Sequence, residues 1–286
     1  MLQDLSFGTL QNEFHTYPPS GEDVVLCFRG SDILLRRNAD DTLELPRVSA
    51  VSLWADSWQL WRQEPLRYVF TMQDVRYHLF MGTAGDCPDS FWQYESVRPL
   101  RQLTSKEVCF AVMTGWHLYN WYRANRFCGA CGTPTVHDDK ERMMRCPACG
   151  NLIFPRISPA VIVAVTDGDR LLLSKYAGRA YTRYALLAGY TEIGETLEGT
   201  IRREVMEEVG LNVKNIRYYK SQPWGVDGNL LTGFFCDLDG DDTIRLDRTE
   251  LAMADWYDRK NLPAHDDGIS LTREMIRVFE EGREPK

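Results

Sequence analysis

The sequence predicts an α+β protein built from three successive segments, residues 1–126, 127–155 and 156–286. Three observations predict this fold class: short β-like runs before a single helix in the first segment, two cysteine pairs in the second, and strand-like runs around a charged helix in the third. A chain of 286 residues exceeds one average domain, so two or three units are expected. A hydrophobic content of 44% is sufficient to build their cores.

Residues 1–126 should form a small mixed α/β N-terminal domain. Turn material such as Gly30-Ser31-Asp32 separates its apolar runs. A helix should follow them, because apolar side chains recur at helical spacing over 108–122 and Thr104-x-x-Glu107 has the form of a capping box. The runs expected as strands are Val24–Arg29, Ile33–Arg36, Tyr68–Met72 and Tyr77–Met81.

Residues 127–155 contain two Cys-x-x-Cys pairs, each followed by glycine. Cys128 and Cys131 form the first pair, and Cys146 and Cys149 form the second. In a reducing compartment this spacing predicts metal ligation rather than two disulfides. Four thiolates usually make a closed, structural Zn²⁺ site that leaves no coordination position for catalysis. A rubredoxin-like iron centre is the first alternative, and a redox-active Cys-x-x-Cys is a weaker one.

From residue 156 the strand-like runs become longer. Ala160–Thr166, the turn Asp167-Gly168-Asp169 and Arg170–Tyr176 predict a β-hairpin. A helix should follow, with Thr196 as its N-cap and Gly210 just past its end. The remaining expected elements are strands near Ile216–Tyr219, Leu231–Asp237 and Trp256-Tyr257, and a final helix over Ser270–Glu281.

The helix after Thr196 carries the most informative pattern. Glu204, Glu207 and Glu208 are spaced i, i+3 and i+4, so they share one helix face. Carboxylates this close repel one another, and a hard divalent cation that also binds substrate phosphates removes the repulsion. For the three glutamates alone, a solvated acidic helix face is the alternative interpretation. The wider pattern decides between the two.

The stretch from Gly189 to Leu211 resembles the Nudix box, the loop–helix–loop signature of hydrolases that act on nucleoside diphosphates linked to another moiety. Every fixed position of the motif is present in this chain. The resemblance implies that residues 156–286 form an α/β/α sandwich. It also implies a catalytic set, which is Glu195, Arg203, Glu204, Glu207 and Glu208.

Features outside the box indicate which family of Nudix hydrolases the chain resembles. A four-cysteine ribbon precedes the box, Ser221-Gln222-Pro223-Trp224 follows it, and Ser96-Val97-Arg98 lies upstream. This combination resembles the NADH pyrophosphatase family, most clearly over the ribbon and the Nudix domain. Such enzymes cleave the pyrophosphate of NADH or NAD into nicotinamide mononucleotide and AMP, and some remove NAD caps from RNA. The resemblance implies a hydrolase of this class, with a dinucleotide substrate and NAD-capped RNA as a further one.

The same resemblance implies individual roles. Catalytic Mg²⁺ or Mn²⁺ would be held by Glu204, Glu208, Glu250 and the backbone carbonyl of Ala188. Tyr190 stands where relatives have a Phe that stacks on nicotinamide. Phe154 matches an aromatic residue supplied by the second subunit of a homodimer. The other residues implied in substrate binding are Arg47, Arg98, Gln222, Pro223, Trp224, Asn229 and Thr272.

The loop after Trp224 departs from the family pattern. Relatives continue with Pro-Phe-Pro and then, one residue on, a small hydroxyl residue, whereas this chain has Gly225-Val226-Asp227-Gly228-Asn229. Two glycines make the loop more flexible, and Asp227 adds negative charge near the expected phosphate site. Thr272 also stands where an Ala is common. These departures affect positions implied in NADH binding, and they leave the residues implied in metal binding unchanged.

Net charge and hydropathy exclude other classes. A net charge of −8 argues against broad electrostatic binding of nucleic acid or anionic membrane, although it permits a local basic pocket. No apolar stretch approaches the roughly 18 residues of a membrane span. The first residues show neither the basic region nor the apolar core of a signal peptide. We therefore expect a cytoplasmic protein that does not bind membranes.

Two rival functions remain at this stage. The nearer one is a Nudix hydrolase for another dinucleotide, such as ADP-ribose or a diadenosine polyphosphate. The more distant one is a zinc-ribbon nucleic-acid-binding module whose Nudix domain senses a ligand without turnover. The complete glutamate set and the acidic net charge argue against the second.

Overall fold

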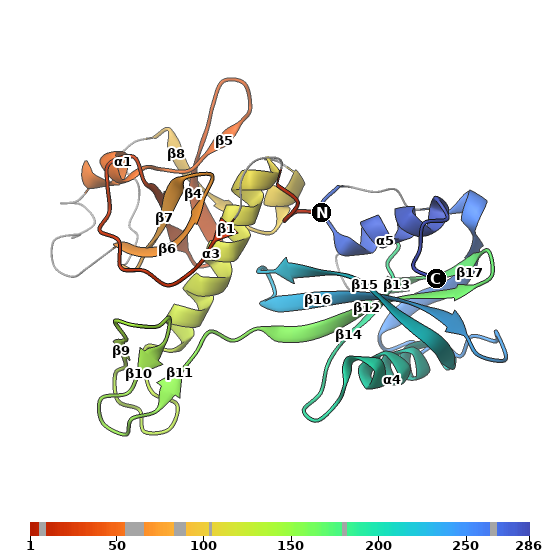
Figure 1. Ribbon diagram of the computed structural model, residues 1–286. Coiled ribbons are helices and arrows are strands. Elements are labelled where there is room, and N and C mark those ends of the chain that lie inside the picture. Colours follow the sequence, from red (N-terminus) through yellow and green to blue (C-terminus); the bar gives the residue numbers. More distant parts are fainter. Residues whose placement is uncertain (6–9, 55–65, 83–89, 103–104, 179–181, 264–267) are drawn as a thin grey trace. The chain divides into compact units, whose positions relative to one another are not determined.

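The computed structural model of the protein describes seven stretches of the chain. They are residues 1–5, 10–54, 66–82, 90–102, 105–178, 182–263 and 268–286. The chain divides into two units, whose helices and strands are labelled in Figure 1. The C-terminal unit comprises residues 1–2, 157–224 and 229–286. The N-terminal unit comprises residues 3–156 and 225–228.

A six-stranded sheet lies at the centre of the C-terminal unit (Figure 1). Its strand order is β15-β16-β12-β13-β17, and β14 also pairs with β12. β12 and β16 run parallel, whereas the other pairs are antiparallel. The strands are β12 (Ser158–Asp167), β13 (Arg170–Tyr176), β14 (Leu187–Tyr190), β15 (Val213–Trp224), β16 (Asn229–Leu238) and β17 (Leu251–Asp258).

Alternation along β12 builds a core on each face of this sheet. Val161, Val163 and Val165 pack with helix α4 (Leu197–Val209), whereas Ile162 and Ala164 pack with helix α5 (Leu271–Glu280). Successive strand side chains point to opposite faces, so one continuous apolar run can serve two cores. Figure 1 shows α4 and α5 on the two sides of the sheet, and the predicted α/β/α sandwich is confirmed.

The ends of α4 and α5 follow the local signals in the sequence. Thr196 caps α4, because its hydroxyl accepts a hydrogen bond from the backbone N–H of Gly199 at 3.1 Å. Gly210 ends α4 in the left-handed conformation, with φ of 70°. Ser270 caps α5 in the same way by accepting from the N–H of Arg273. The predicted boundaries of both helices are confirmed.

The predicted strands of this unit are also confirmed, although β15, β16 and β17 extend beyond the expected runs and β14 was not predicted. β12 ends at Asp167 and β13 begins at Arg170, so the expected turn joins them. β15 is longer than expected, because it continues through Ser221–Trp224. These residues therefore pair with the start of β16. A short 3₁₀ helix over Arg259–Asn261 follows β17.

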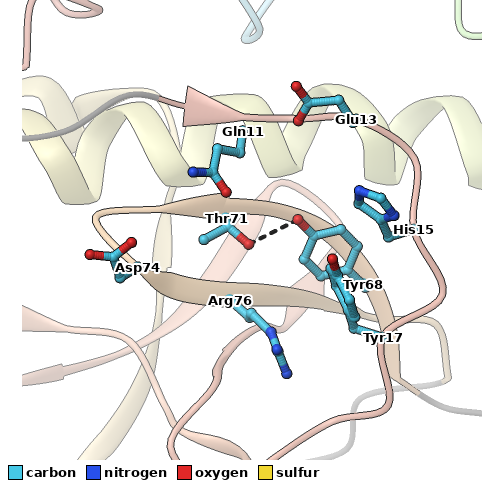
Figure 2. A pocket seen from close by; sticks show the side chains of 8 residues that line it. All are labelled: Gln11, Glu13, His15, Tyr17, Tyr68, Thr71, Asp74 and Arg76. Atoms are coloured by element: carbon cyan, nitrogen blue, oxygen red, sulfur yellow. Dashed lines mark hydrogen bonds between the residues drawn. The ribbon is translucent and has the colours of Figure 1, made fainter.

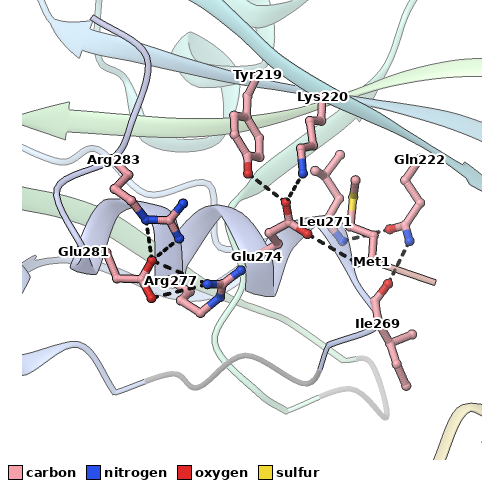
Figure 3. Close-up of polar contacts among 10 residues, drawn as sticks. All are labelled: Met1, Tyr219, Lys220, Gln222, Ile269, Leu271, Glu274, Arg277, Glu281 and Arg283. Carbon is pink, nitrogen blue, oxygen red and sulfur yellow. Dashed lines mark hydrogen bonds and ion pairs between the residues drawn. The ribbon is translucent and has the colours of Figure 1, made fainter. Parts of the chain in front are cut away.

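Polar contacts fasten α5 to the sheet (Figure 3). The buried carboxylate of Glu274 accepts hydrogen bonds from the hydroxyl of Tyr219 at 2.7 Å and from Nζ of Lys220 at 2.6 Å. The amino group of Met1 lies 3.3 Å from its other oxygen. Burial opposes ionisation, but the contacts with Lys220 and Tyr219 outweigh it and lower the pKa of Glu274 to about 2. Glu274 is thus an ionised anchor of α5.

The N-terminal unit contains three small sheets and one long helix among its described residues. The sheets have the orders β1-β6-β7-β2, β3-β4-β5 with β8 beside β4, and β11-β10-β9. The strands are β1 (Leu10–Gln11), β2 (Val24–Leu26), β3 (Phe28–Arg29), β4 (Asp32–Arg37), β5 (Leu43–Glu44), β6 (Leu66–Met72), β7 (Val75–Phe80), β8 (Trp92–Ser96), β9 (Val136–His137), β10 (Met144–Arg145) and β11 (Leu152–Ile153). The helices are α1 (Val48–Ser52), a 3₁₀ turn over Pro99–Gln102 and α3 (Lys106–Ala124).

Two predictions for this unit require correction. The run expected as one strand over Val24–Arg29 is divided at Cys27, and its halves, β2 and β3, belong to different sheets. The N-cap of α3 is Ser105, whose hydroxyl accepts from the backbone N–H of Val108 at 3.3 Å. The capping box predicted from Thr104-x-x-Glu107 is therefore wrong by one residue. Thr104 itself lies outside the described residues.

A polar hollow of about 210 Å³ lies on the N-terminal unit, beside the β6–β7 hairpin (Figure 2). The Tyr17 ring contacts the rings of His15 and Tyr68, with centroids 4.9 and 5.0 Å apart, and the Arg76 guanidinium lies 4.5 Å from its centre. These contacts hold the segment after β1 against the hairpin. The residues that line the hollow are Gln11, Glu13, His15, Tyr17, Tyr68, Thr71, Asp74 and Arg76.

Among the helices of the described chain, none has both the length and the apolar character needed to cross a bilayer.

Candidate active site and zinc centre

Arg203 on α4 lies at the centre of a carboxylate cluster. Its Nε and Nη2 donate to the two oxygens of Glu195 at 2.7 and 2.9 Å. Its Nη1 donates to Glu204 at 2.8 Å and to Glu207 at 3.0 Å. Nη2 also donates to the backbone carbonyl of Tyr190 at 2.9 Å. A single guanidinium therefore connects α4, the preceding loop and the end of β14, as the planar fork of arginine allows.

Glu195 is held by more than Arg203. Its Oε2 also accepts from the hydroxyl of Thr200 at 3.0 Å and from the backbone N–H of Glu192 at 3.1 Å. The contact with Arg203 is the main cause that lowers the pKa of Glu195 to about 2, and it raises the pKa of Arg203 in turn. Glu195 is therefore a positioning residue, since its oxygens are used to orient the guanidinium.

Gly189 is the position at which β14 approaches α4 most closely. A Cβ atom at this residue would lie 1.9 Å from Cδ of Glu204 and 2.0 Å from Oε1. No side chain fits at such a distance, so the Glu204 carboxylate occupies the space that any other residue would fill. The carboxylate is thereby placed against the strand that carries Ala188.

The charges around Glu204 resemble a cation site. Burial raises the pKa of Glu204, Arg203 opposes this effect, and the charges of Glu207 and Glu250 raise the pKa further. Glu208, on the same helix, is only 2% exposed. Glu250 directly precedes β17, and its carbonyl accepts from the N–H of Ala177 at 2.8 Å. Carboxylates concentrated in this way suit a divalent cation with oxygen ligands.

The glutamates do not converge as tightly as the four cysteines. Within the described residues, the cysteines are the group whose ligand atoms all lie within 4.8 Å of one another. Arg203 contacts Oε1 of Glu204 and Oε2 of Glu207. The other oxygen of each carboxylate is outside this contact and is the one suited to a cation. The donor set is therefore appropriate for a divalent cation with oxygen ligands.

The four cysteine sulfurs form a compact cluster. Sγ of Cys128 lies 3.6 Å from Sγ of Cys149, and Sγ of Cys131 lies 3.4 Å from Sγ of Cys146. A tetrahedral ion with Zn–S bonds of about 2.3 Å would place its sulfurs about 3.8 Å apart. The backbone N–H of Ala130 is the main cause that lowers the pKa of Cys128 to about 6, which favours the thiolate form. The cluster fits zinc.

Several predicted substrate residues lie side by side where β15 leads into β16. Trp224 and Asn229 are paired across the two strands, and Pro223 pairs with Leu230. Tyr190, at the end of β14, is 52% exposed, and its hydroxyl donates to Oδ1 of Asn229 at 3.1 Å. The structure thus brings Tyr190, Asn229 and Trp224 to one end of the sheet.

Gln222 has a different environment (Figure 3). Its side chain is fully buried, Oε1 accepts from the N–H of Leu271 at 2.8 Å, and Nε2 donates to the carbonyl of Ile269 at 2.8 Å. Both ends of its amide therefore bind backbone on the two sides of Ser270. Thr272, the second residue of α5, is half-buried. In this arrangement Gln222 positions the start of α5.

The other predicted substrate residues belong to the N-terminal unit. Arg47 precedes α1 and donates to the carbonyl of Glu22. Arg98 pairs with Asp227 at 3.4 Å, so the negative charge that the altered loop introduces has a basic partner. Phe154 directly follows β11 and is 54% exposed.

Two family models match the chain, and together they cover most of its second half. A NUDIX domain matches residues 156–279, and an NADH pyrophosphatase zinc ribbon domain matches residues 123–154. The NAD-capped RNA hydrolase NudC of Klebsiella pneumoniae (strain 342) is 42% identical over 199 residues, which are 65% of this chain and 77% of that protein. The chain belongs to the NADH pyrophosphatase family of Nudix hydrolases.

A second relative supports this assignment. The NAD-capped RNA hydrolase NudC of Chromobacterium violaceum is 36% identical over 231 residues, which are 79% of this chain and 87% of that protein. A crystal structure of a NUDIX hydrolase from Nitrosomonas europaea is similar over 56% of this chain and 94% of its own, with 24% identity and a TM-score of 0.48. The family membership and the four-cysteine zinc ribbon predicted from the sequence are confirmed.

One residue of the site, Thr200, and two of its contacts were not predicted from the sequence. Thr200 fastens Glu195 from within α4, yet a buried threonine on a helix carries no distinguishing signal. Tyr190 and Asn229 were each expected at the site, but their pairing across 39 residues is visible only in the fold. The close approach at Gly189 could have been suspected, because a fixed glycine often marks a place where two parts of the chain meet.

Proposed function

We propose that this protein hydrolyses the pyrophosphate bond of NADH or NAD to give nicotinamide mononucleotide and AMP, and that it removes NAD caps from RNA. The observation that carries the proposal is the combination, in one chain, of the Arg203-centred carboxylate cluster and the four-thiolate ribbon. Similarity to NAD-capped RNA hydrolases over 77% and 87% of their lengths supports the substrate class. The family models at 123–154 and 156–279 support a division into residues 1–126, 127–155 and 156–286.

The proposed reaction is attack by a water oxygen on one phosphorus, while the bridging oxygen leaves with the other phosphate. Mg²⁺ or Mn²⁺, held by Glu204, Glu208, Glu250 and the carbonyl of Ala188, would neutralise the diphosphate and lower the pKa of the attacking water. A glutamate of the box takes the proton from the water. Because these carboxylates lie close together in the site, this role is assigned to the set rather than to one member.

The supporting residues keep this set in place. Glu195 orients Arg203, and Arg203 in turn holds one oxygen of Glu204 and one of Glu207. Gly189 leaves the space that the Glu204 carboxylate occupies. Such fixed geometry lowers the reorganisation needed for the transition state. Zinc in the ribbon is proposed to be structural, because four thiolates leave no position open for substrate.

Substrate profiling tests the proposal. Rates on NADH, NAD, NAD-capped RNA, ADP-ribose and diadenosine polyphosphates should be measured with Mg²⁺ and with Mn²⁺. We expect turnover of NADH or NAD well above that of a Glu208→Gln variant purified in parallel, which reports contaminating activity. If none of these compounds is hydrolysed above this background, the proposed function is wrong, and a ligand-sensing Nudix domain remains.

The altered loop favours one alternative substrate class. Gly225 and Asp227 stand where the family pattern has prolines, and the negative charge of Asp227 is paired with Arg98. A Nudix hydrolase for another dinucleotide, ADP-ribose or a diadenosine polyphosphate, is therefore the alternative. The substrate profile described above distinguishes this alternative from the NADH proposal, because the alternative predicts a higher kcat/KM for those compounds than for NADH.

We also propose a cytoplasmic homodimer in which Phe154 contributes to the partner's substrate site. The 54% exposure of this large apolar side chain supports the proposal. Phe154→Ala should raise KM for NADH while sedimentation still shows a dimer. An active monomer of the unmutated protein would contradict a composite site.

A further inference from the structure

Residues 225–228, which join β15 to β16, belong to the N-terminal unit and lie against its helix α3. The residues on either side of this loop, Trp224 and Asn229, pair with each other across the two strands. The loop turns back on itself, because the N–H of Gly228 donates to the carbonyl of Gly225 at 3.4 Å. A change in the loop therefore reaches two residues implied in substrate binding through the covalent chain.

Gly225 is a point of very close approach between the loop and α3. This glycine is buried, and a Cβ atom on it would lie 2.1 Å from the backbone oxygen of Met113 and 2.7 Å from its carbonyl carbon. The helix is itself held tightly on the core, because a Cβ atom at Gly115 would lie 2.2 Å from Cδ1 of the fully buried Leu26. Only glycine therefore fits at position 225 in this arrangement.

His117 supports the other end of the loop. A Cβ atom at Gly228 would lie 3.4 Å from Nε2 of His117, so this glycine rests on the imidazole ring. Gly228 has a φ of 72°, a left-handed backbone conformation that favours glycine. Met113 and His117 are spaced i and i+4, so they lie on the same side of α3 and contact the loop at both of its ends.

The same histidine fastens a second segment of the chain. Its Nε2 donates to the backbone carbonyl of Arg156 at 2.7 Å. Arg156 lies two residues before β12, and the first residue of β12, Ser158, pairs with Asn229 at the start of β16. One imidazole therefore contacts both segments that lead into these two parallel strands.

These contacts replace the local stiffness that prolines would give the loop. Gly225 and Asp227 stand where the family pattern has prolines, and a proline carries the Cβ atom that Met113 excludes at position 225. Asp227 pairs instead with Arg98 at 3.4 Å. In this chain the loop is thus held by packing on α3, which the glycines make possible.

We propose that His117 is a positioning residue for the substrate site. By contacting Gly228 and binding the carbonyl of Arg156, it fixes the segments that lead into β16 and β12, and it thereby sets the positions of Trp224 and Asn229. His117 acts through the loop rather than on the substrate. The proposal rests on the proposed function, because it names what keeps that site in its binding geometry.

The test changes the histidine and the loop separately. His117→Leu removes the N–H donor and keeps a side chain of similar size, whereas His117→Gln keeps a donor that can reach the Arg156 carbonyl. Gly225→Ala places a Cβ atom against Met113 and tests the same loop independently. Gly21→Ala is the matched control, because a Cβ atom there would make an ordinary contact with Cβ of Ser49 at 3.8 Å. Thermal unfolding shows which variants fold.

His117→Leu should raise KM for NADH by about three- to tenfold, the range expected for one hydrogen bond. Its kcat should change less, because the Arg203-centred carboxylate cluster is untouched, and His117→Gln should recover most of the loss. Gly225→Ala should also raise KM. A loop that was merely flexible would give the opposite sign, since replacing glycine by alanine would then stiffen it and favour binding. Gly21→Ala should match the unmutated protein.

Hydrogen exchange without substrate provides a second measurement. The amides of residues 224–229 should exchange faster in His117→Leu and Gly225→Ala than in the unmutated protein and in Gly21→Ala. An unchanged KM in His117→Leu, a lower KM in Gly225→Ala, or unchanged exchange in both variants would overturn the inference. An unmutated protein that does not hydrolyse NADH would instead overturn the proposed function, and the exchange rates would still decide whether His117 holds the loop.

Discussion

Replacing Gly189 by alanine adds a single methyl group, and it should nevertheless inactivate the site. The added Cβ would lie 1.9 Å from Cδ of Glu204, whereas carbon atoms in contact normally lie about 3.5–4.0 Å apart. Either the carboxylate or the strand must therefore move by roughly 1.5–2 Å. A displacement of about 1 Å in a catalytic group can cost ~10²-fold in rate. We expect kcat of Gly189→Ala to fall by about 10²-fold or more.

The assay is the initial rate of NADH hydrolysis at saturating Mg²⁺ or Mn²⁺, with thermal unfolding measured on the same samples. Gly199→Ala is the control, because a Cβ there would contact only the Thr196 hydroxyl, at an ordinary 3.4 Å, and alanine suits the interior of α4. The control should keep its activity and its stability. A Gly189→Ala protein with near-normal kcat would show that the Glu204 carboxylate is not held where the reasoning requires it.

Three further predictions concern the carboxylates, the ribbon and the response to pH. Glu204→Gln and Glu208→Gln should each lose ~10²-fold or more in kcat with little change in thermal stability, and near-normal rates at saturating metal would reject their roles. Cys128→Ser or Cys146→Ser should release zinc and lower Tm, and metal analysis that finds iron, or no metal, in the unmutated protein would overturn the zinc assignment. Glu274 has its folded-state pKa lowered to about 2, so its contribution to stability should be complete above pH 5 and be lost as pH falls from about 4.5 towards 2. Urea unfolding of Glu274→Gln should therefore differ from the unmutated protein at pH 7 and converge with it near pH 2, and a difference that does not depend on pH would contradict the anchor role.

Local signals in the sequence predicted the elements whose ends are set by short-range contacts. The caps of α4, at Thr196 and Gly210, depend on hydrogen bonds and backbone conformation within a few residues. The hairpin turn after Asp167 and the two cysteine pairs are local in the same sense. The spacing of the three glutamates in the box predicted that they share one helix face, because helical periodicity alone decides which residues share a face.

Contacts between distant residues account for what the sequence did not predict. The division of one apolar run at Cys27 follows from pairing with two different sheets. The family resemblance implies that Gln222 binds substrate. In the fold, its amide also binds backbone groups next to α5 that are 47 and 49 residues away in the sequence. The bond between Tyr190 and Asn229 likewise depends on strand register, which no local pattern encodes.

The most direct test of the proposed function is the ratio of kcat/KM for NADH to kcat/KM for ADP-ribose. Both compounds contain the same pyrophosphate next to adenosine, but ADP-ribose has no ring to stack on Tyr190. Aromatic contact of ~1–3 kcal/mol corresponds to a preference for NADH of roughly five- to 160-fold. We predict that ratio, with nicotinamide mononucleotide and AMP as the products, and its loss in Tyr190→Ala. Equal kcat/KM for the two compounds in the unmutated protein would contradict the nicotinamide assignment.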